Sequence, residues 1–493
     1  MNTLFEKLKQ RAQFKGPELA LKSAQQHVSN LQLLERIDDL ADQLGKTKLS
    51  CVALYMDNSI EWIVADLAAM KLGLTLIPIP LFFSQQQRQH LIHDAGIQAV
   101  ITQQELSKSF NYSRQHTLPG MQLLVLDNAS QPDISQLKNV AKITYTSGST
   151  GNPKGVCLST SNLQEVTQAL ADSISGLGVR HHLCIMPLAT LLENIAGVYV
   201  PLLMGSSIQV EPLSTIGFTQ SSGFNEQKFM TCIAQTKPNS IILLPQLLTS
   251  LIGLKQRIPD SFQSLKFIAV GGGKSAQATL EKAHDLKLPV YEGYGLSECA
   301  SVVSLNNPKH NKPGSVGRVL PHTQVRISQE GEIIVEGQAM LGYLGQNDLT
   351  KVSQNCEIHT GDLGHIDSEG FLYISGRKKN LIVSSFGRNI SPEWVESELQ
   401  QAAPIAQVAI FGDAKPWLSA IINPVANCTN LDIDVVIQQC NERLPDYAQI
   451  KRWLKSSDAF SAQNQQLTEN GRLRRDAIYS RYQDQLSELY DLI

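Results

Sequence analysis

A segment rich in hydroxyl groups and glycine lies at residues 145–155, with the sequence YTSGSTGNPKG. Its hydroxyls can donate hydrogen bonds, its glycines let an anion approach the backbone, and Lys154 adds a positive charge, a combination suited to polyphosphate. It is not a Walker loop, because the Gly-x-x-x-x-Gly-Lys-Ser/Thr spacing is missing and Gly155 follows the lysine. A flexible surface connector is the alternative, but the apolar runs AKIT and VCLS on either side favour a loop between ordered elements.

A second glycine-rich site follows the apolar run LKFIAV at 265–270. Gly271, Gly272 and Gly273 would let a flat base or an acyl group lie against bare backbone. This triple glycine is not a dinucleotide-binding fingerprint, because the Gly-x-Gly-x-x-Gly spacing fails.

The hydroxyl-rich segment resembles the phosphate loop of the acyl-adenylate-forming (AMP-binding) superfamily, which includes acyl-CoA synthetases, peptide-synthetase adenylation domains and luciferases. The opening MDNSIEWIVADLAAMKLG (56–73) also resembles that family. Further family signatures follow in the family's order and extend the resemblance over nearly the whole chain: PLATLLE (187–193), YEGYGLSE (291–298), HTGDLG (359–364), GRKKNLIV (376–383) and SFGRNISPEWVE (385–396). We therefore identify the chain as a member, in the acyl-CoA synthetase or fatty acid–CoA ligase branch.

The resemblance implies an enzyme, an AMP-forming acid–thiol ligase with two half-reactions. A carboxylic acid, expected to be a fatty acid, would attack the α-phosphate of ATP, release pyrophosphate and form acyl-AMP. The acyl group would then pass to the thiol of coenzyme A. Fixed donors, cations and Mg²⁺ would stabilise the charge that gathers on the phosphate oxygens. Two alternatives stay open: a ligase that loads the phosphopantetheine of an acyl or peptidyl carrier protein, and a weakly active nucleotide or acyl-adenylate binding protein.

The resemblance also implies which residues hold the nucleotide. Glu298 would hold Mg²⁺, because a carboxylate is a hard oxygen ligand, and Ser297 would bond a phosphate oxygen. Thr150 is expected nearest the departing β- and γ-phosphates. The full set expected at these phosphates is Thr146, Ser147, Gly148, Ser149, Thr150, Gly151 and Lys154.

Further matching positions concern the adenosine. Tyr294 would stack on adenine, framed by Glu292 and Gly293, with Gly272 and Gly273 against the base or the acyl group. Asp362 would accept hydrogen bonds from both ribose hydroxyls, and Arg377 would support it. The structural alternatives are a half-buried core aromatic for Tyr294 and a loop-capping carboxylate for Asp362.

Two positions depart from the family pattern. The family places a catalytic lysine in a Thr-x-x-Gly-Lys setting near the carboxy terminus, whereas this chain has LTENGRLRR, with Arg472 at the matching position. Arginine keeps the charge but is planar and longer, so the exchange is not conservative. We expect Arg472 to replace the lysine; a chain weak in adenylation is the alternative. Thr190, where many relatives have histidine, is expected to tune the entrance of the acyl pocket. The catalytic candidates are Arg472, Lys154, Thr150 and Glu298.

The acyl pocket is expected around LATLLENIAGVYV (188–200), beside the triple glycine. Ala196, Gly197 and Val198 offer no countercharge for an ammonium group, which favours an aliphatic or aromatic acid over an amino acid. The loop around Gly387 is expected to face the thiol channel, and it also suits the cap of a helix that begins near Pro392.

The elements that must position these residues alternate along the chain. Helices are expected at 60–73 and 161–178, and strands at 51–56, 74–80, 240–245, 265–270 and 288–293. Strand, helix, strand in sequence predicts mainly parallel sheets covered by helices.

The length of 493 residues is too great for one compact core. From about residue 331 short strands and turns dominate, and the last hundred residues mix strands with polar helices. We therefore predict an α/β fold with a large amino-terminal lobe, 1–378, of mainly parallel sheets covered by helices plus a small β-barrel-like part. A small mobile α+β carboxy-terminal domain, 379–493, would swing on a hinge near Lys379 between the two half-reactions.

The composition of the chain limits the classes of binding partner and the cellular location that we expect. A formal charge of −3 and the lack of a basic run argue against nucleic acid. No secretory signal is evident, and the most apolar window, 183–204, contains Glu193 and two prolines, so no transmembrane segment is expected, while peripheral membrane contact stays open. Eight cysteines without a Cys-x-x-Cys pair indicate reduced thiols and a cytoplasmic location.

Overall fold

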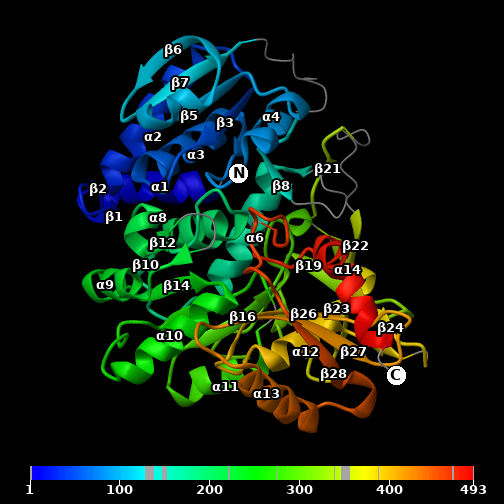
Figure 1. Cartoon of the computed structure of the whole chain (residues 1–493). Coiled ribbons are helices and arrows are strands. Elements are labelled where there is room, and N and C mark those ends of the chain that lie inside the picture. The colour runs from blue at the N-terminus through cyan, green and yellow to red at the C-terminus, as the bar shows by residue number, and fades with distance from the viewer. Residues whose placement is uncertain are drawn as a thin grey trace.

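The computed structural model describes residues 3–127, 138–146, 153–219, 223–273, 275–337, 339–345, 356–386, 388–468 and 471–491. In Figure 1 the blue to green segments form a large lobe, and the orange and red carboxy-terminal segments gather in a smaller domain beside it. This arrangement confirms the predicted α/β class with a large amino-terminal lobe and a small carboxy-terminal domain. None of the described helices is long and apolar enough to cross a lipid bilayer.

The first large sheet has the strand order β21-β9-β8-β4-β3-β5-β7-β6. Strands β5, β3, β4 and β8 run parallel at its centre, and β8 and β9 form an antiparallel hairpin. In the sequence, the segment expected to bind phosphate runs from the end of β8 to the start of β9. The strands are β3 (Cys51–Tyr55), β4 (Thr75–Pro78), β5 (Ala99–Thr102), β6 (Tyr112–Leu118), β7 (Met121–Leu126), β8 (Lys142–Thr146), β9 (Lys154–Leu158) and β21 (Gly342–Tyr343).

The second large sheet has the order β18-β17-β16-β15-β14-β10-β11-β1-β2. Its strands from β16 across to β1 run parallel. The strands are β1 (Leu19–Lys22), β2 (His27–Ser29), β10 (His181–Leu183), β11 (Ser207–Gln209), β14 (Ser240–Leu243), β15 (Phe267–Val270), β16 (Val290–Tyr294), β17 (Ser304–Leu305) and β18 (Arg318–Val319).

Helices cover these sheets, as the alternating pattern predicts. They are α1 (Thr3–Phe14), α2 (Asn30–Gly45), α3 (Ile60–Leu72), α4 (Gln85–Asp94), α6 (Thr160–Ser173), α7 (Val200–Met204), α8 (Leu213–Ile216), α9 (Glu226–Thr236), α10 (Pro245–Arg257) and α11 (Gln277–Asp285), with the π-helix η2 (Glu193–Tyr199) and the 3₁₀ turns η1 (Gln104–Ser109) and η3 (Ser297–Cys299). A short hairpin joins β12 (Phe218–Thr219) to β13 (Gly223–Phe224). The expected helix at 161–178 is too long, because Gly176 and Gly178 take positive φ values of 84° and 63° that an α-helix cannot contain.

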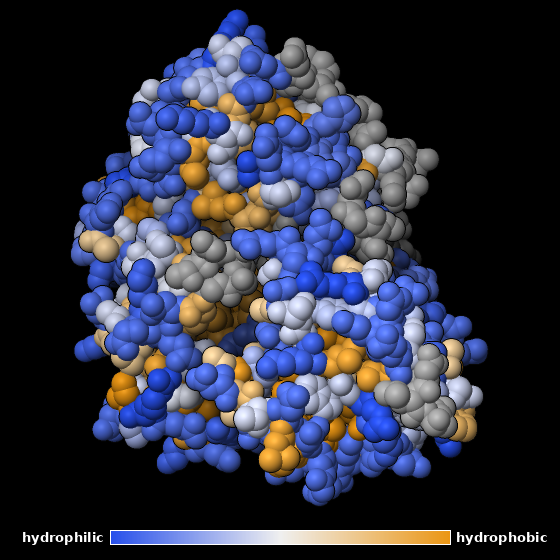
Figure 2. Space-filling view, viewed as in Figure 1, coloured by the Kyte–Doolittle hydropathy of each residue, from blue (hydrophilic) through white to orange (hydrophobic). Residues whose placement is uncertain are grey.

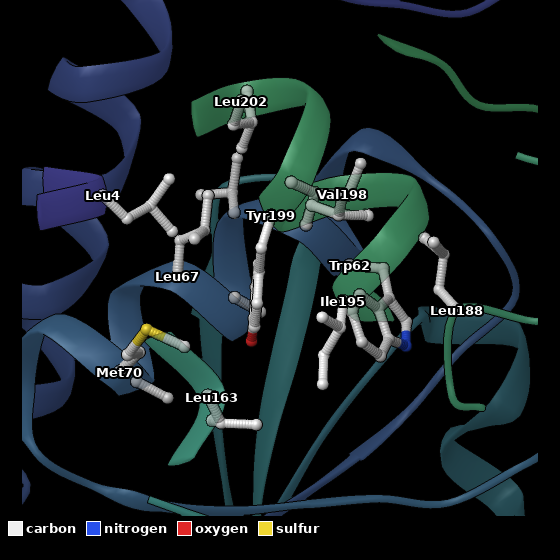
Figure 3. Close-up of a cluster of buried hydrophobic side chains, with 14 of the residues drawn as sticks. Leu4, Trp62, Leu67, Met70, Leu163, Leu188, Ile195, Val198, Tyr199 and Leu202 are labelled. Atoms are coloured by element: carbon white, nitrogen blue, oxygen red, sulfur yellow. The ribbon is translucent and has the colours of Figure 1, made fainter. Parts of the chain in front are cut away.

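The largest apolar core lies where α2, α3 and α6 meet η2 and α7. Figure 3 shows Trp62, Leu163, Ile195 and Val198 converging there, with Tyr199 between them. Each is fully or almost fully buried. Val198, expected near the acyl pocket, is thus a core residue.

A charged network is buried within this core. Nζ of Lys142, on β8, donates to Asp66 Oδ1 at 2.6 Å and to Tyr199 Oη at 2.9 Å, and it also contacts Asn194 Oδ1. Tyr199 Oη and Asn194 Nδ2 in turn donate to Asp66 Oδ2, at 2.6 and 2.9 Å. All three ammonium donors therefore have partners, as a buried charge requires. The network joins the strand before the phosphate loop to the π-helix.

The remaining sheets follow in sequence. A four-stranded antiparallel sheet of order β19-β20-β22-β23 stands where the small β-barrel-like part was expected, and a sheet of order β26-β27-β28 lies in the small domain. Their strands are β19 (Thr323–Ile327), β20 (Glu332–Gly337), β22 (Cys356–Ile366), β23 (Leu372–Arg377), β26 (Ile405–Phe411), β27 (Leu418–Pro424) and β28 (Ile450–Lys455). The ribbon β24 (Ile382–Val383) with β25 (Asn389–Ile390), the helices α12 (Pro392–Leu399), α13 (Asn430–Arg443) and α14 (Arg475–Asp491), and the turns η4 (Lys378–Asn380) and η5 (Asp446–Ala448) complete the chain.

Candidate functional site

A cavity of about 710 Å³ opens at the carboxyl ends of β8, β15 and β16. Ligand sites in open α/β sheets favour such strand ends. The space-filling view in Figure 2 shows a mostly hydrophilic surface, with apolar side chains gathered where the face is hollowed near its middle. The cavity brings together many of the residues that the sequence singled out: Thr146, Lys154, Gly272, Gly293, Tyr294, Ser297, Glu298, Arg377 and Arg472.

The two ends of the phosphate loop lie at this cavity. Thr146 and Lys154 are register partners at the end of the β8–β9 hairpin, and both line the cavity. Ser147, Gly148, Ser149, Thr150 and Gly151 lie outside the described residues. So does Gly387, the glycine expected at the thiol channel.

The expected ribose ligand, Asp362, is buried and engaged on both oxygens. Arg377 Nε lies 2.8 Å from its Oδ1, and Tyr294 Oη donates to its Oδ2 at 2.7 Å. Asp362 and Arg377 are register partners in β22 and β23, which holds Asp362 beside Arg377, a residue of the cavity lining. Burial, and then the Asp362 charge, raise the pKa of Tyr294, so its hydroxyl stays protonated as a donor. Tyr294 both packs on the core beneath it and lines the cavity.

Glu298, the expected magnesium ligand, lies next to a residue that the sequence did not single out. Tyr343 Oη donates to Glu298 Oε1 at 2.8 Å, and Nζ of Lys154 lies 5.4 Å from the centre of the Tyr343 ring. Burial, and then Glu298, raise the pKa of Tyr343. Tyr343 reaches this place because the two-residue strand β21 pairs with β9, a pairing with no signal in the sequence.

The donor set at Glu298 fits Mg²⁺. Its carboxylate lines the cavity, and among the described residues no hydrogen bond is recorded to its second oxygen, Oε2. Hard carboxylate oxygens are the ligands that Mg²⁺ prefers. A second group, His182, Cys184 and Glu193, has ligand atoms within 4.8 Å of one another, but hydrogen bonds within the protein account for all three.

Arg472 reaches the cavity from the small domain. Its Nε and Nη2 donate to the carbonyl oxygen of Gly272 at 3.3 and 3.1 Å. Arg472 is exposed as a residue, but the groups around its guanidinium desolvate it and so lower its pKa; the charge of Arg377 lowers the pKa further, while Asp362 and Glu298 raise it. The loop is anchored just beyond Arg472, because Arg475 donates to both oxygens of the buried Glu396, at 2.6 and 2.5 Å. The small domain thus supplies a cation to the site.

Glu292 does not line the large cavity, unlike its neighbours Gly293 and Tyr294. Its Oε1 accepts a hydrogen bond from the backbone N–H of Ser275 at 3.1 Å, in the loop that follows the triple glycine. The carboxylate is buried there and borders a separate small pocket with Asn306. Its observed contact fixes the glycine loop, and a direct role toward the base stays a prediction, as does that of Gly273.

Beyond Gly271 the cavity continues between the second sheet and the helices α6, η2 and α7. Ser240, Ile242, Phe267 and Ala269 contribute the sheet side. Ala196 and Thr190 line it as expected, and Thr190 Oγ1 donates to the Pro187 carbonyl at 2.6 Å. Gly197 lies against the Glu193 and His182 side chains instead. The helix side consists of Leu170, Ile174, Leu192, Val200 and Met204.

Comparison with family models identifies the family of the chain. The family model described as AMP-binding enzyme matches residues 8–344, and the model of the AMP-binding enzyme C-terminal domain matches residues 379–492. The 2-succinylbenzoate–CoA ligases of Bacillus cereus (strain AH820) and Bacillus thuringiensis subsp. konkukian (strain 97-27) are each 29% identical over 479 residues, covering 91% of this chain and 93% of theirs.

Solved structures share the fold. The anthranilate CoA ligase AuaEII in complex with anthranoyl-AMP has a TM-score of 0.80 at 17% identity, over 98% of this chain and 97% of that one. The o-succinylbenzoate coenzyme A synthetase from Bacillus subtilis in complex with ATP and a magnesium ion has a TM-score of 0.74 at 23% identity, over 95% and 98%.

Proposed function

This chain belongs to the AMP-binding enzyme family as an AMP-forming acid–thiol ligase, and we propose that it uses ATP to activate an aromatic acid and transfers it to coenzyme A. In the first half-reaction the acid's carboxylate oxygen bonds to the α-phosphorus, the bond to the β-phosphate oxygen breaks, and pyrophosphate leaves. In the second, the thiol loses its proton and bonds to the acyl carbon, and AMP leaves. The observation that carries this proposal is the meeting of Lys154, Glu298, Arg377 and Arg472 at one cavity, with Asp362 paired to Arg377.

Each of these groups has a task that its position supports. Lys154, with the loop before it, would hold the phosphates that leave, and Asp362, braced by Arg377 and Tyr294, would hold the ribose hydroxyls. Arg472 would bring its charge to the α-phosphate and the attacking carboxylate, where charge develops in the transition state. Mg²⁺ held by Glu298 would neutralise charge on the departing pyrophosphate.

The relatives bear on the acid and on its acceptor. Their name specifies 2-succinylbenzoate and coenzyme A, which supports an aromatic acid of that kind and gives no support to a carrier protein as acceptor or to the expected fatty acid. A fatty acid is kept as the second candidate because the cavity walls beyond Gly271 are mostly apolar and run along the sheet.

A panel assay tests the function. We expect pyrophosphate release that depends on ATP, Mg²⁺ and one class of acid, and a coenzyme A thioester detectable by mass spectrometry. The panel should include 2-succinylbenzoate, anthranilate, benzoate and straight-chain acids of two to sixteen carbons. Absence of pyrophosphate release with every acid would contradict the proposal, whereas turnover of straight-chain acids alone would move the choice to the second candidate.

Gly271 gives a structural check of where the acid enters. A Cβ built at this position would meet the Gly293 carbonyl oxygen at 3.5 Å and Leu192 Cδ2 at 3.8 Å, which are ordinary contacts. Gly271→Ala should therefore keep most activity, whereas Gly271→Leu should block the passage and reduce kcat/KM for the preferred acid at least about 100-fold, as expected for a side chain that overfills a packed site. Activity on acetate should change less than about threefold. Equal losses for large and small acids would contradict this path.

A further inference from the structure

The deep part of the cavity carries two polar side chains that the proposed reaction leaves unused, His182 and Ser240. They are register partners in the parallel pair β10 and β14. The Ser240 hydroxyl lies 2.9 Å from Nδ1 of His182, and Nε2 of His182 lies 3.1 Å from Oε1 of Glu193. Each of the three residues is at most 4% exposed. They form one hydrogen-bonded chain that ends at the cavity wall.

The partners of His182 and Glu193 orient this hydrogen-bonded chain toward Ser240. Nε2 of His182 faces a carboxylate oxygen and therefore carries a proton. The other oxygen of Glu193 accepts from the Met186 backbone N–H at 3.0 Å. The contact between Nδ1 of His182 and Oγ of Ser240 holds the hydroxyl in place. Where the ring nitrogen donates in this contact, the hydroxyl proton of Ser240 is left for donation into the cavity.

The surroundings of Ser240 make such a donor unusual. Ile174, Val179, Ile242 and Phe267 line the same deep region. A donor that faces apolar walls gains most from a ligand that supplies a matching acceptor, because an unpaired buried polar group costs free energy.

The sheet register gives the distance of the Ser240 hydroxyl from the nucleotide end of the cavity. Ser240 pairs with Phe267 and Leu243 with Val270, and the Gly271 N–H donates to the Leu243 carbonyl at the nucleotide end. Three residues of strand span about 10 Å. A hydrogen bond covers about 3 Å of this distance. The acceptor on the acid should therefore lie roughly 7–10 Å from the reacting carboxyl group.

We propose that Ser240, oriented by His182 and Glu193, donates a hydrogen bond to an acceptor group at the far end of the acid. The substrate class is then an acid that carries a second carboxylate or carbonyl, rather than a plain hydrocarbon tail. This proposal rests on the proposed function, because it assumes that the acid enters with its reacting carboxylate toward Arg472. Ser240 contacts the substrate, and His182 and Glu193 are positioning residues.

Matched acids test the proposal. 2-Succinylbenzoate and 4-oxo-4-phenylbutanoate differ only in the ring carboxylate, and octanedioate and octanoate form an aliphatic pair. We expect the wild-type enzyme to favour the diacid of at least one pair at least tenfold in kcat/KM. Ser240→Ala should reduce that preference at least tenfold, mainly through KM, while kcat/KM for the matching monoacid changes less than threefold. A site built to bond a polar group penalises the analogue that lacks it.

The neighbouring strand pair supplies the control. His181 Nδ1 lies 2.9 Å from Ser207 Oγ, the same contact as His182 with Ser240, but between residues outside the cavity lining. Ser207→Ala should leave the preference unchanged, and Ser240→Thr, which keeps the hydroxyl, should retain it within about threefold.

The outcomes separate the two proposals. A wild-type ratio near one in both pairs overturns the subsite even if Ser240→Ala fails to fold. An unchanged ratio in folded Ser240→Ala overturns it as well. If no acid releases pyrophosphate, the proposed function fails instead.

Discussion

An Arg472→Ala enzyme is expected to lose acyl-AMP formation about 100- to 1,000-fold, the usual effect of removing one fixed donor from a developing oxyanion. The Arg472 side chain comes from the small domain and donates hydrogen bonds to the Gly272 carbonyl in the cavity. Its loss would leave Lys154 and the loop to stabilise the transition state from the other end. ATP–pyrophosphate exchange with the preferred acid measures the effect.

The second half-reaction provides an internal comparison. If Arg472 serves adenylation alone, synthetic acyl-AMP and coenzyme A should give thioester with Arg472→Ala at a rate within about fivefold of wild type. Arg474→Ala is the matched control, since Arg474 lies two residues along the same segment and is not part of the cavity lining. Equal loss of both half-reactions, or full exchange activity in Arg472→Ala, would contradict the assignment.

The Arg472→Lys variant tests whether adenylation needs the planar guanidinium group. The guanidinium contacts the Gly272 carbonyl through two nitrogens, whereas a lysine presents one compact charge on a shorter reach. We expect exchange activity between those of wild type and Arg472→Ala. Activity above wild type would mean that the site is still arranged for the lysine of the family pattern.

Local patterns in the sequence were sufficient for most of the fold. The strand expected at 51–56 is β3 (Cys51–Tyr55), which its apolar run specifies locally. The helix expected at 60–73 is α3 (Ile60–Leu72), whose start is specified by the Ser59 cap. The order of such elements then determined the parallel sheets. The predicted end of the helix at 161–178 was wrong, because its apolar pattern continues beyond Ser173, where α6 ends.

The site was predictable only as far as motifs reach. Asp362, Arg377 and Arg472 belong to quoted motifs, and the fold brings Arg377 and Arg472 to one cavity, with Asp362 paired to Arg377. Tyr343 and Ser240 belong to none, and their positions depend on strand pairings between distant segments, β21 with β9 and β10 with β14. A single sequence does not reveal such pairings, because side-chain periodicity specifies the face of a strand and not its neighbour.

The π-helix η2 links the two parts of the cavity. Its Glu193 supports the His182–Ser240 pair, and its Asn194 and Tyr199 bind Lys142 on the strand that leads into the phosphate loop. Single π-turns inside helices are often found at functional sites. Here the turn lets consecutive residues serve two buried polar networks, one at the acyl end and one at the phosphate end.

Replacing Lys142 with methionine is expected to destabilise the large lobe by about 3–5 kcal/mol, because it leaves the Asp66 carboxylate buried without its cation. Lys142 and Asp66 are 2% and 1% exposed, and their charged atoms lie 2.6 Å apart. The midpoint of the first urea transition measures the change. Lys71→Met is the matched control, since Lys71 pairs with Asp38 at the surface, where removal should cost less than about 1 kcal/mol.

A double variant separates the charge from the packing. Lys142→Met with Asp66→Leu removes both charges, and replacing a whole buried pair by apolar residues is far milder than breaking it. We expect the double variant to recover at least half of the stability lost by Lys142→Met. If it is as unstable as the single variant, the loss comes from packing around the longer lysine stem, and the network is not held together by its charge. If Lys142→Met lowers the free energy of unfolding no more than Lys71→Met does, the buried ammonium does not stabilise the network that joins β8 to η2.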